Sequence, residues 1–263
     1  MNAAVIEIEN FSYAFGARRI LNKISFRVGE ADYLSIIGPN GAGKTTLLKC
    51  LNRILPGGEG TIKIRGKPLE SYSQRALARL VSYVPQLDGR ALPFTVDEFV
   101  SMGRYPYLNP FSPLSAGDRR VVREILEQTG TLAFAGRRLD TLSGGERQKV
   151  FIAAALAQGA EILLLDEPTS FLDYRHQVEI NRLLRELNRV NGKTVLAVTH
   201  DINNAVLSCN RVLALKDGET VFAGNARELV RKETLESIYE TSFLFVENPH
   251  SSLPLVRPAE SGA

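Results

Sequence analysis

The sequence predicts an α/β fold with a core of buried strands and helices, a small antiparallel β-subdomain and an inserted helical subdomain. Three observations lead to this prediction. Short runs of continuous apolar residues are typical of central strands covered on both faces. Other segments alternate apolar and polar residues, as half-buried antiparallel strands do. Between Gln86 and Ala157 the strand signals nearly vanish and helix starts take their place.

The side sheet is predicted from three alternating segments. Apolar residues alternate with polar ones at Val5, Ile6 and Ile8, again from Ser25 to Val28, and once more from Thr61 to Arg65. Because successive side chains of a strand point to opposite faces, this pattern indicates strands with one face buried. We therefore expect a small antiparallel sheet beside the core.

The core strands are predicted at Tyr33–Ile37, Ile162–Leu165 and Thr194–Val198, which are short and apolar throughout. A helix is expected from Lys44 to Ile54, directly after the first of them. Such runs of continuous apolar character favour strands of an α/β sheet that is covered by helices on both sides.

A second core helix is predicted from Val178 to Val190. Its apolar residues recur at helical spacing, at Ile180, Leu183, Leu184 and Leu187. Gly192 follows at the place where a glycine commonly ends a helix.

The inserted helical subdomain, at about residues 87–157, is predicted from two helix starts. Thr95 with Glu98, and Ser143 with Glu146, have the spacing of capping boxes, in which each side chain satisfies a backbone amide of the other residue.

The end of the chain has two further features. Arg211–Lys216 and 219–223 flank Asp217-Gly218, a pair favoured in two-residue hairpin turns. Residues 241–263 are expected to form a C-terminal tail, and after Val246 this tail is rich in Pro and Ser, so we expect that part of it to be poorly ordered. Residues 1–240 are expected to form one domain that includes the inserted lobe. A chain of 263 residues with 44% apolar content is suited to one sizeable domain of this kind.

Composition excludes several classes of protein. The net charge of +3 comes from 32 basic and 29 acidic residues, a balance that predicts no nucleic-acid partner. Cys50 and Cys209 have no second ligand at metal spacing, so we interpret both as core thiols in a reducing compartment. The first residues, MNAAVIEIEN, lack the pattern of a secretory signal, and no stretch reaches the ~20 apolar residues of a membrane span. A cytoplasmic location is expected, with any membrane role supplied by a partner.

The strongest motif is the segment between the first core strand and the following helix, which matches G-x-x-x-x-G-K-[ST]. Its residues are Gly38, Pro39, Asn40, Gly41, Ala42, Gly43, Lys44, Thr45 and Thr46. The glycines let successive backbone amides point at phosphate oxygens, and the helix dipole favours the same negative charge. Lys44 is predicted to reach the β- and γ-phosphates of ATP, and Thr45 to offer its hydroxyl to Mg²⁺. The alternative is a glycine-rich turn with an incidental lysine.

The second motif is a buried strand that ends in two adjacent carboxylates, Asp166 and Glu167. Because adjacent strand residues point to opposite sides, we expect the two to have different roles. Asp166 is predicted to hold Mg²⁺ through its water shell, and Glu167 to polarise the water that attacks the γ-phosphate. Taken alone, the pair is equally compatible with a solvated turn.

The third motif is the helix start at Ser143, Gly144 and Gly145, which has the features of an anion site. An ordinary N-capped helix explains the same residues. The order of the motifs decides between the two. Along the chain one meets the phosphate loop, Gln86, Leu142-Ser143-Gly144-Gly145, Asp166-Glu167-Pro168, Asp173 and His200. This succession resembles the ATP-binding cassette (ABC) ATPase family along nearly the whole chain, and it implies a P-loop NTPase (RecA-like) core.

The resemblance implies a composite site between two chains. In that family Ser143, Gly144 and Gly145 would bind the γ-phosphate that the other subunit holds. Only one phosphate loop and one such helix start occur in this sequence. A homodimer, or a pairing with a second similar chain, is therefore expected, with a two-fold axis that makes two equivalent sites.

Further roles carry over from the resemblance one residue at a time. Tyr13 would stack on adenine, and Gln86 would meet Mg²⁺ and sense the transporter. Asp173 would make a contact across the dimer, at the ATP of the other subunit, and His200 would grip the γ-phosphate. Each has a plain alternative. Tyr13 is also compatible with a strand aromatic, Gln86 with a loop amide, and His200 with the first turn of a helix beside Asp201.

The branch of the family is suggested by the stretch from Thr95 to Pro110 and by the residues from Asp173 to Ile180. Both are similar to ATPases that power uptake of iron-siderophores, haem and cobalamin, with residues 103–107 the most similar; molybdate importers share much of this pattern. Rigid aromatics near the surface of the lobe suit docking to a membrane subunit. A structural loop whose aromatics pack on their own lobe is the alternative.

These features favour an importer ATPase at the cytoplasmic face of the inner membrane, peripheral to it. Its expected partners are two transmembrane permease subunits, docked near Gln86 and 104–108, and indirectly a periplasmic substrate-binding protein. The competing hypothesis is a soluble cassette ATPase of a cytoplasmic assembly pathway. The sequence does not encode the transported substrate, because such an ATPase touches ATP and its neighbours, and import is inferred from the resemblance alone.

Overall fold

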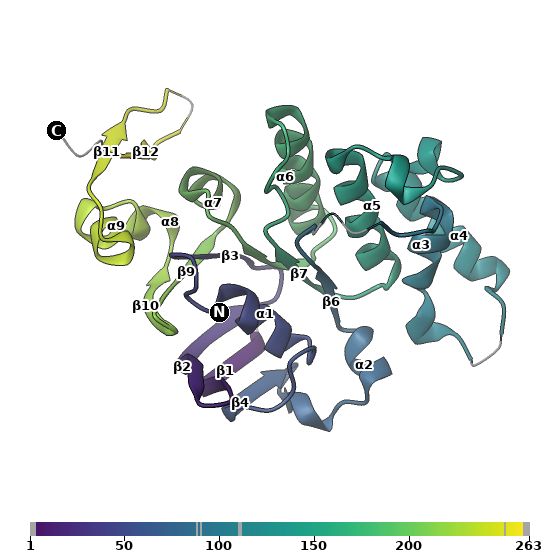
Figure 1. The fold of residues 1–263 in the computed structure, drawn as a ribbon, viewed down its shortest axis with the longest axis horizontal. Helices are drawn as coiled ribbons and strands as arrows, with labels where there is room; N and C mark the ends of the chain where they lie inside the picture. The colour runs from purple at the N-terminus through teal and green to yellow at the C-terminus, as the bar shows by residue number, and fades with distance from the viewer. Residues whose placement is uncertain (1–3, 88, 90, 110–111, 250, 260–263) are drawn as a thin grey trace. The chain divides into compact units, whose positions relative to one another are not determined.

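The structure, a computed structural model, describes residues 4–87, 89, 91–109, 112–249 and 251–259. The chain forms two compact units, one of Met1–Leu69 with Thr194–Ala263 and the other of Glu70–Lys193. The short 3₁₀ turn η1 (Leu69–Ser71) begins at the last residue of the first stretch. We call the first of these compact units unit 1 and the second unit 2, and we describe each by itself (Figure 1).

Unit 1 contains strands of three sheets and the helices beside them. Its elements are β1 (Ala4–Phe15), β2 (Arg18–Gly29), β3 (Tyr33–Ile37), α1 (Lys44–Leu51), β4 (Glu59–Ile64), β5 (Lys67–Pro68), β8 (Thr194–Val198), α7 (Ile202–Ser208), β9 (Arg211–Lys216), β10 (Glu219–Gly224), α8 (Ala226–Leu229), α9 (Lys232–Tyr239), β11 (Phe243–Val246) and β12 (Leu255–Pro258).

The predicted side sheet is present and runs in the order β2-β1-β4-β5, with antiparallel neighbours. Ile6 pairs with Val28 on one side and with Ile64 on the other, and all three side chains are fully buried. The alternating pattern therefore predicted both the strands and the face that they bury.

In a second sheet of unit 1, β3 lies between β8 and β9 and pairs with both in parallel, while β10 pairs with β9 antiparallel. Every residue of β3 and β8 is buried, as the continuous apolar runs predicted. The β9-β10 hairpin turns at Asp217 and Gly218, whose positive φ angles of 50° and 78° fit the predicted two-residue turn.

The expectation of a poorly ordered tail is wrong for its described residues. β11 pairs with β12, and Val256 is buried in a cluster with Phe243 and residues of α7, α8 and α9. The Asn203 side chain of α7 fixes the ribbon, because its amide nitrogen donates to the Val256 carbonyl at 2.9 Å and its oxygen accepts from the Val256 amide at 2.7 Å. Composition alone missed the apolar residues that make this packing possible. Residues 250 and 260–263 of the tail lie outside the described residues.

Unit 2 carries the predicted helical lobe. Its elements are α2 (Gln74–Ala78), β6 (Val81–Val84), α3 (Val96–Met102), α4 (Ala116–Gln128), α5 (Gly144–Ala157), β7 (Ile162–Asp166) and α6 (Tyr174–Arg189), with 3₁₀ turns η2 (Tyr105–Tyr107), η3 (Leu132–Phe134) and η4 (Leu139–Thr141). The helices α3, α4 and α5 pack on one another around a cluster that includes Val100, Leu126 and Val150 (Figure 1).

The helix starts of the lobe follow the predicted capping boxes. Thr95 and Glu98 exchange both hydrogen bonds at the start of α3, and Ser143 and Glu146 do so at the start of α5. The same local chemistry occurs unpredicted at Ser115, which caps α4 with Asp118. In the described parts of the chain, we find no helix with the length and apolar content that crossing a membrane requires.

Two predicted helix boundaries need correction. α1 ends at Leu51 rather than Ile54, and α6 begins at Tyr174, a full turn before Val178, because the side chain of Asp173 caps it. Gly192 has a φ of 66°, in agreement with its predicted role after that helix.

Candidate phosphate site and its partner motifs

The phosphate loop connects β3 to α1 within unit 1. Gly38, Gly41 and Gly43 all have positive φ angles, of 137°, 82° and 93°, which glycine adopts with little strain. At Gly38 a Cβ atom would also overlap the backbone carbonyl of Leu215 in β9. The loop therefore depends on glycine for its backbone angles and, at Gly38, for space against the sheet.

Lys44 lies in the first turn of α1 and is 7% exposed. Its Nζ donates to the backbone carbonyls of Gly38 and Pro39, both at 2.8 Å, so the ammonium sits inside the curve of its own loop. No acidic residue occurs in the first turn of α1. A buried cation and the positive end of a helix dipole thus coincide, which favours a polyanion at this point.

His200 follows β8, the parallel neighbour of β3. Ile36 of β3 pairs with Val198 of β8, and the Thr199 amide donates to the Ile36 carbonyl at 3.1 Å. The phosphate loop and the exposed His200 therefore leave the carboxyl ends of adjacent strands, where ligands of open α/β sheets bind. Asp201, the next residue, caps α7.

Tyr13 lies in β1 and is half-buried, with the Phe15 ring edge-on at 5.2 Å. It borders a pocket of about 340 Å³ in unit 1. The lining residues are Ser12, Tyr13, Ala14, Arg19, Pro56, Gly58 and Glu59.

The two adjacent carboxylates of unit 2 have the different surroundings that the sequence predicted. Asp166 is 2% exposed and accepts a hydrogen bond from the Tyr83 hydroxyl at 3.0 Å. Burial, together with the neighbouring Asp166 carboxylate, raises the pKa of Tyr83 well above its usual range, so the phenol stays protonated as the donor. Glu167 instead accepts from the Gln86 amide at 2.9 Å and from the Ser170 hydroxyl at 2.7 Å.

Gln86 and Glu167 meet because β6 and β7 are parallel neighbours. Val84 pairs with Leu165, so the segments that follow both strands leave the same edge. The backbone of Glu167 has a φ of 49°, in the left-handed region that non-glycine residues rarely adopt. Such strain is concentrated at functional sites, where the surrounding structure maintains it.

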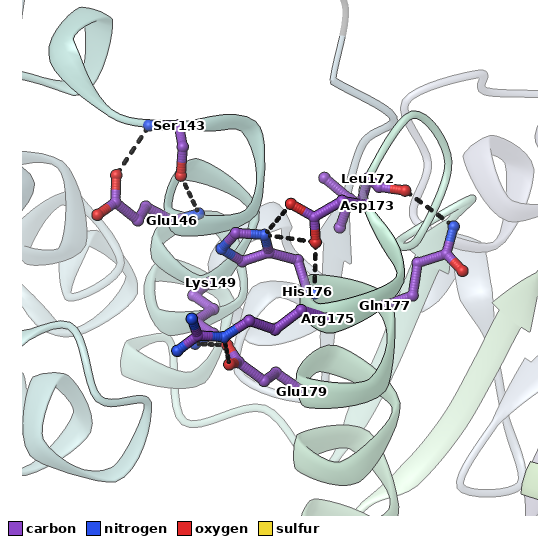
Figure 2. A network of polar contacts seen from close by, with 9 residues as sticks. All are labelled: Ser143, Glu146, Lys149, Leu172, Asp173, Arg175, His176, Gln177 and Glu179. Atoms are coloured by element: carbon purple, nitrogen blue, oxygen red, sulfur yellow. Dashed lines mark hydrogen bonds and ion pairs between the residues drawn. The ribbon is translucent and has the colours of Figure 1, made fainter.

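The third motif forms the first turn of α5. Ser143 Oγ accepts from the Glu146 amide at 3.3 Å, and the Glu146 carboxylate accepts from the Ser143 amide at 2.8 Å (Figure 2). The hydrogen bond from the Ser143 backbone is the main cause that holds the pKa of Glu146 below its usual range. Gly144 and Gly145 continue the turn, and Asp173 lies nearby as the cap of α6 (Figure 2).

Unit 1 thus brings together the phosphate loop with Lys44, Thr45 and Thr46, and places His200 at the adjacent strand end. Unit 2 brings Gln86 to Glu167 and places Asp173 beside the Ser143 turn. Sequence reasoning missed Tyr83, Ser170 and His176, each of which contacts a predicted site residue. In the sequence, these three residues are marked by nothing more than their position within a few residues of the motifs, because their contacts form when the backbone folds.

The predicted magnesium ligands are all oxygen donors: the Thr45 hydroxyl, the Asp166 carboxylate and the Gln86 amide. Oxygen donors of these kinds, a buried carboxylate such as Asp166 among them, fit the chemistry of Mg²⁺, which takes one or two carboxylates and keeps several waters. The residues that the structure describes contain no group of three or more His, Cys, Asp or Glu arranged to hold a metal by themselves.

Comparison with known proteins identifies the family. Residues 21–170 match the family model described as ABC transporter. The chain belongs to the ABC transporter family. It is an ATP-binding ATPase of that family.

Characterised relatives resemble this ABC ATPase over nearly its full length. It is 37% identical over 250 residues to the iron(3+)-hydroxamate import ATP-binding protein FhuC of Bacillus subtilis. The matched region covers 95% of this chain and 93% of that protein. The ferric enterobactin transport ATP-binding protein FepC of Escherichia coli is 36% identical, covering 95% and 92%.

Solved structures agree with the fold of this ABC ATPase. A metal-chelate type ABC transporter in an inward-facing conformation matches with a TM-score of 0.86 and 27% identity, covering 98% of this chain and 99% of that one. The dimeric structure of MJ0796, a bacterial ABC transporter cassette, matches with a TM-score of 0.72 and 31% identity, covering 84% and 99%.

Proposed function

We propose that this ABC ATPase powers the import of an iron chelate as a homodimer at the cytoplasmic face of the inner membrane, below two permease subunits. The observation that carries the proposal is the similarity, over nearly the whole chain, to ATP-binding proteins named for iron(3+)-hydroxamate import and ferric enterobactin transport. Haem and cobalamin are the other chelates in the predicted class. A periplasmic binding protein delivers the chelate to the permease, without touching the ATPase.

In the proposed reaction, the amides of the phosphate loop and Lys44 bind the β- and γ-phosphates, and His200 contacts the γ-phosphate. Thr45, Asp166 and Gln86 would hold Mg²⁺, directly or through its water shell, and the bound ion would neutralise charge on the phosphates. Glu167 takes a proton from the attacking water as the water oxygen bonds to the γ-phosphorus. The bond from that phosphorus to the oxygen that bridges to the β-phosphate breaks, and ADP leaves with the electron pair of that bond. Tyr83 keeps the Asp166 carboxylate oriented through its hydrogen bond.

Dimerisation is part of the proposed mechanism because the Ser143 turn has its role on the partner's nucleotide. Two exposed aromatics flank Asp173: Phe171 is 90% exposed and Tyr174 is 87% exposed. Such side chains gain by burial in an interface. A facing copy that closes over Asp173 also covers them, and the dimeric cassette MJ0796 supports this arrangement by analogy.

The permease is proposed to dock on a groove of about 710 Å³ in the helical lobe. Its surface is mainly apolar, with Met102 and Tyr105 exposed by 46% and 65%, and two acidic residues are part of its lining. A short amphipathic helix with a basic end fits this chemistry. The lining residues are Asp97, Glu98, Ser101, Met102, Tyr105, Leu108, Ser112 and Leu114.

Some of the aromatic and proline side chains between residues 103 and 107 pack on their own lobe, as the structural alternative expects. Pro106 is buried, and the guanidinium carbons of Arg79 and Arg104 lie 4.8 and 4.1 Å from the centre of the Tyr107 ring. Arg104 also pairs with Asp118 at 3.0 Å. Tyr107 therefore braces the loop. Tyr105 has the Arg75 guanidinium 5.6 Å from its ring centre but remains 65% exposed, and we propose that it meets the partner. Pro110, the last residue of the similar stretch, lies outside the described residues.

Changing Met102 to Glu tests the docking surface. We expect Met102→Glu to lower co-purification with the permease pair at least tenfold, because a charge at an apolar interface loses its hydration. The measurement is the amount of each permease subunit recovered with the tagged ATPase from detergent-solubilised membranes. Val190→Glu, at another exposed apolar position, is the matched control and should leave recovery unchanged.

Uptake of a radiolabelled ferric hydroxamate by cells that carry the chain with its permease pair tests the function itself. Accumulation that disappears in Met102→Glu and persists in Val190→Glu supports the proposal. A stable complex with only soluble proteins, and no accumulation of any chelate, would favour an assembly ATPase instead.

A further inference from the structure

His176 lies in the first turn of α6, between the Ser143 turn, which the proposed mechanism assigns to the partner's nucleotide, and Asp173, over which the facing copy is proposed to close. Its Nδ1 is 2.9 Å from both carboxylate oxygens of Asp173, and its backbone amide donates to the same carboxylate at 2.9 Å. Because a carboxylate only accepts, Nδ1 carries the hydrogen. Backbone and ring therefore hold Asp173 at the helix cap from two directions (Figure 2).

The other side of the His176 ring meets α5. A Cβ atom placed on Gly145 would overlap the ring carbons Cγ and Cδ2, so the imidazole packs directly on the backbone of that glycine. The side chain of His176 is 24% exposed, whereas that of Asp173 is 66% exposed. A mostly covered ring thus joins an exposed carboxylate to the turn that carries Ser143.

Two further contacts strengthen this connection within unit 2. Lys149 of α5 forms an ion pair with Glu179 of α6, one turn beyond His176 (Figure 2). The side chain of Gln177 donates to the Leu172 carbonyl at 3.0 Å and so ties down the segment that precedes Asp173. Two contacts therefore join α5 to α6 near their starts: the ion pair of Lys149 with Glu179, and the packing of His176 on Gly145. Of these two, the His176 contact is the one that involves predicted functional residues.

We propose that His176 is a positioning residue that fixes Asp173 to the Ser143–Gly145 turn, so that both segments meet the partner's ATP as one rigid element. The inference rests on the proposed dimeric mechanism. His176 acts through Asp173 and Gly145, and it has no part in binding ATP to its own phosphate loop. Its loss weakens ATP-driven dimerisation and leaves the affinity of a single chain for ATP as it was.

Two variants separate the hydrogen bond from the bulk of the ring. His176→Leu keeps apolar volume beside Gly145 and removes the donor. His176→Asn places an amide nitrogen near the position of Nδ1 and keeps the donor. Both are made in the full chain with Glu167→Gln, so that bound ATP persists. Arg182→Gln, at an exposed position further along α6, is the matched control.

Sedimentation with saturating Mg-ATP measures the dimer dissociation constant, and a fluorescent ATP analogue at low protein concentration measures binding to the single chain. We expect His176→Leu to weaken dimerisation about tenfold or more, the effect of losing a hydrogen bond to a charged group. His176→Asn should remain within about threefold of the parent, as should Arg182→Gln. Single-chain binding of the analogue should be equal in all four proteins.

The inference is overturned if His176→Leu dimerises like the parent, if His176→Asn is as weak as His176→Leu, or if single-chain ATP binding falls with dimerisation. A parent that binds ATP and never dimerises contradicts the proposed function instead, which separates the two failures. Should His176→Leu not fold, the ¹⁵N spectrum of the parent decides. A hydrogen-bearing Nδ1 in the ATP-bound dimer supports the inference, and an Nδ1 without a hydrogen overturns it.

Discussion

Glu167→Gln is expected to lower the rate of ATP hydrolysis by about 10² to 10⁴-fold, the usual contribution of a general base. Glutamine has nearly the same shape and retains hydrogen-bonding capacity toward Gln86 and Ser170, but it cannot take a proton from water. Binding of ATP should persist, because the phosphate loop lies elsewhere in the sequence and its contacts are unchanged. The variant should therefore accumulate with ATP bound.

The measurement is phosphate release at saturating Mg-ATP, together with the amount of nucleotide retained after rapid desalting. Glu186→Gln, an exposed position on α6, is the matched control and should hydrolyse ATP like the parent. Normal turnover by Glu167→Gln would show that Glu167 is not the base, even though its backbone is strained.

Lys44→Ala should raise the dissociation constant for ATP about a hundredfold or more. The ammonium is almost fully buried and held by two carbonyls of its own loop, so it is positioned before the nucleotide arrives. Charge-assisted hydrogen bonds to phosphate contribute about 1.5 to 3 kcal/mol each, and two such bonds account for the expected loss. Alanine continues α1 without strain, so the fold should persist.

Titration of the purified chain with ATP by calorimetry checks this expectation, with circular dichroism to verify folding. Lys49→Ala, in the last turn of the same helix, should bind like the parent. Equal affinity in Lys44→Ala and Lys49→Ala would contradict the assignment of the loop as the phosphate site.

Much of the fold could be predicted because local chemistry and tertiary packing agree. The runs at Tyr33–Ile37 and Thr194–Val198 are apolar throughout and are buried throughout. Asp217-Gly218 favours one type of turn, and the hairpin has it. At Ser143 and Glu146 the helix start needs only four consecutive residues, so the sequence contains all of the information.

Other features depend on contacts between distant residues and were beyond sequence reasoning. The strand β6 is four residues long, too short for a clear period, and the ribbon of β11 and β12 is stabilised by Asn203 far away in the chain. The left-handed backbone of Glu167 has no local signal, since glycine is the residue that normally marks it. The contact of His176 with Gly145 likewise appears only when α5 and α6 are folded.

The central claim is that ATP bound to the phosphate loop is completed by Ser143 of a second copy. The most direct measurement is the mass of Glu167→Gln by sedimentation, with and without Mg-ATP, compared with the same chain that also carries Ser143→Arg. We predict that Mg-ATP doubles the mass of the first protein, while the second binds ATP equally well and keeps the mass of one chain. A Ser143→Arg chain that still dimerises with ATP, or a parent that stays single with ATP bound, would contradict the account.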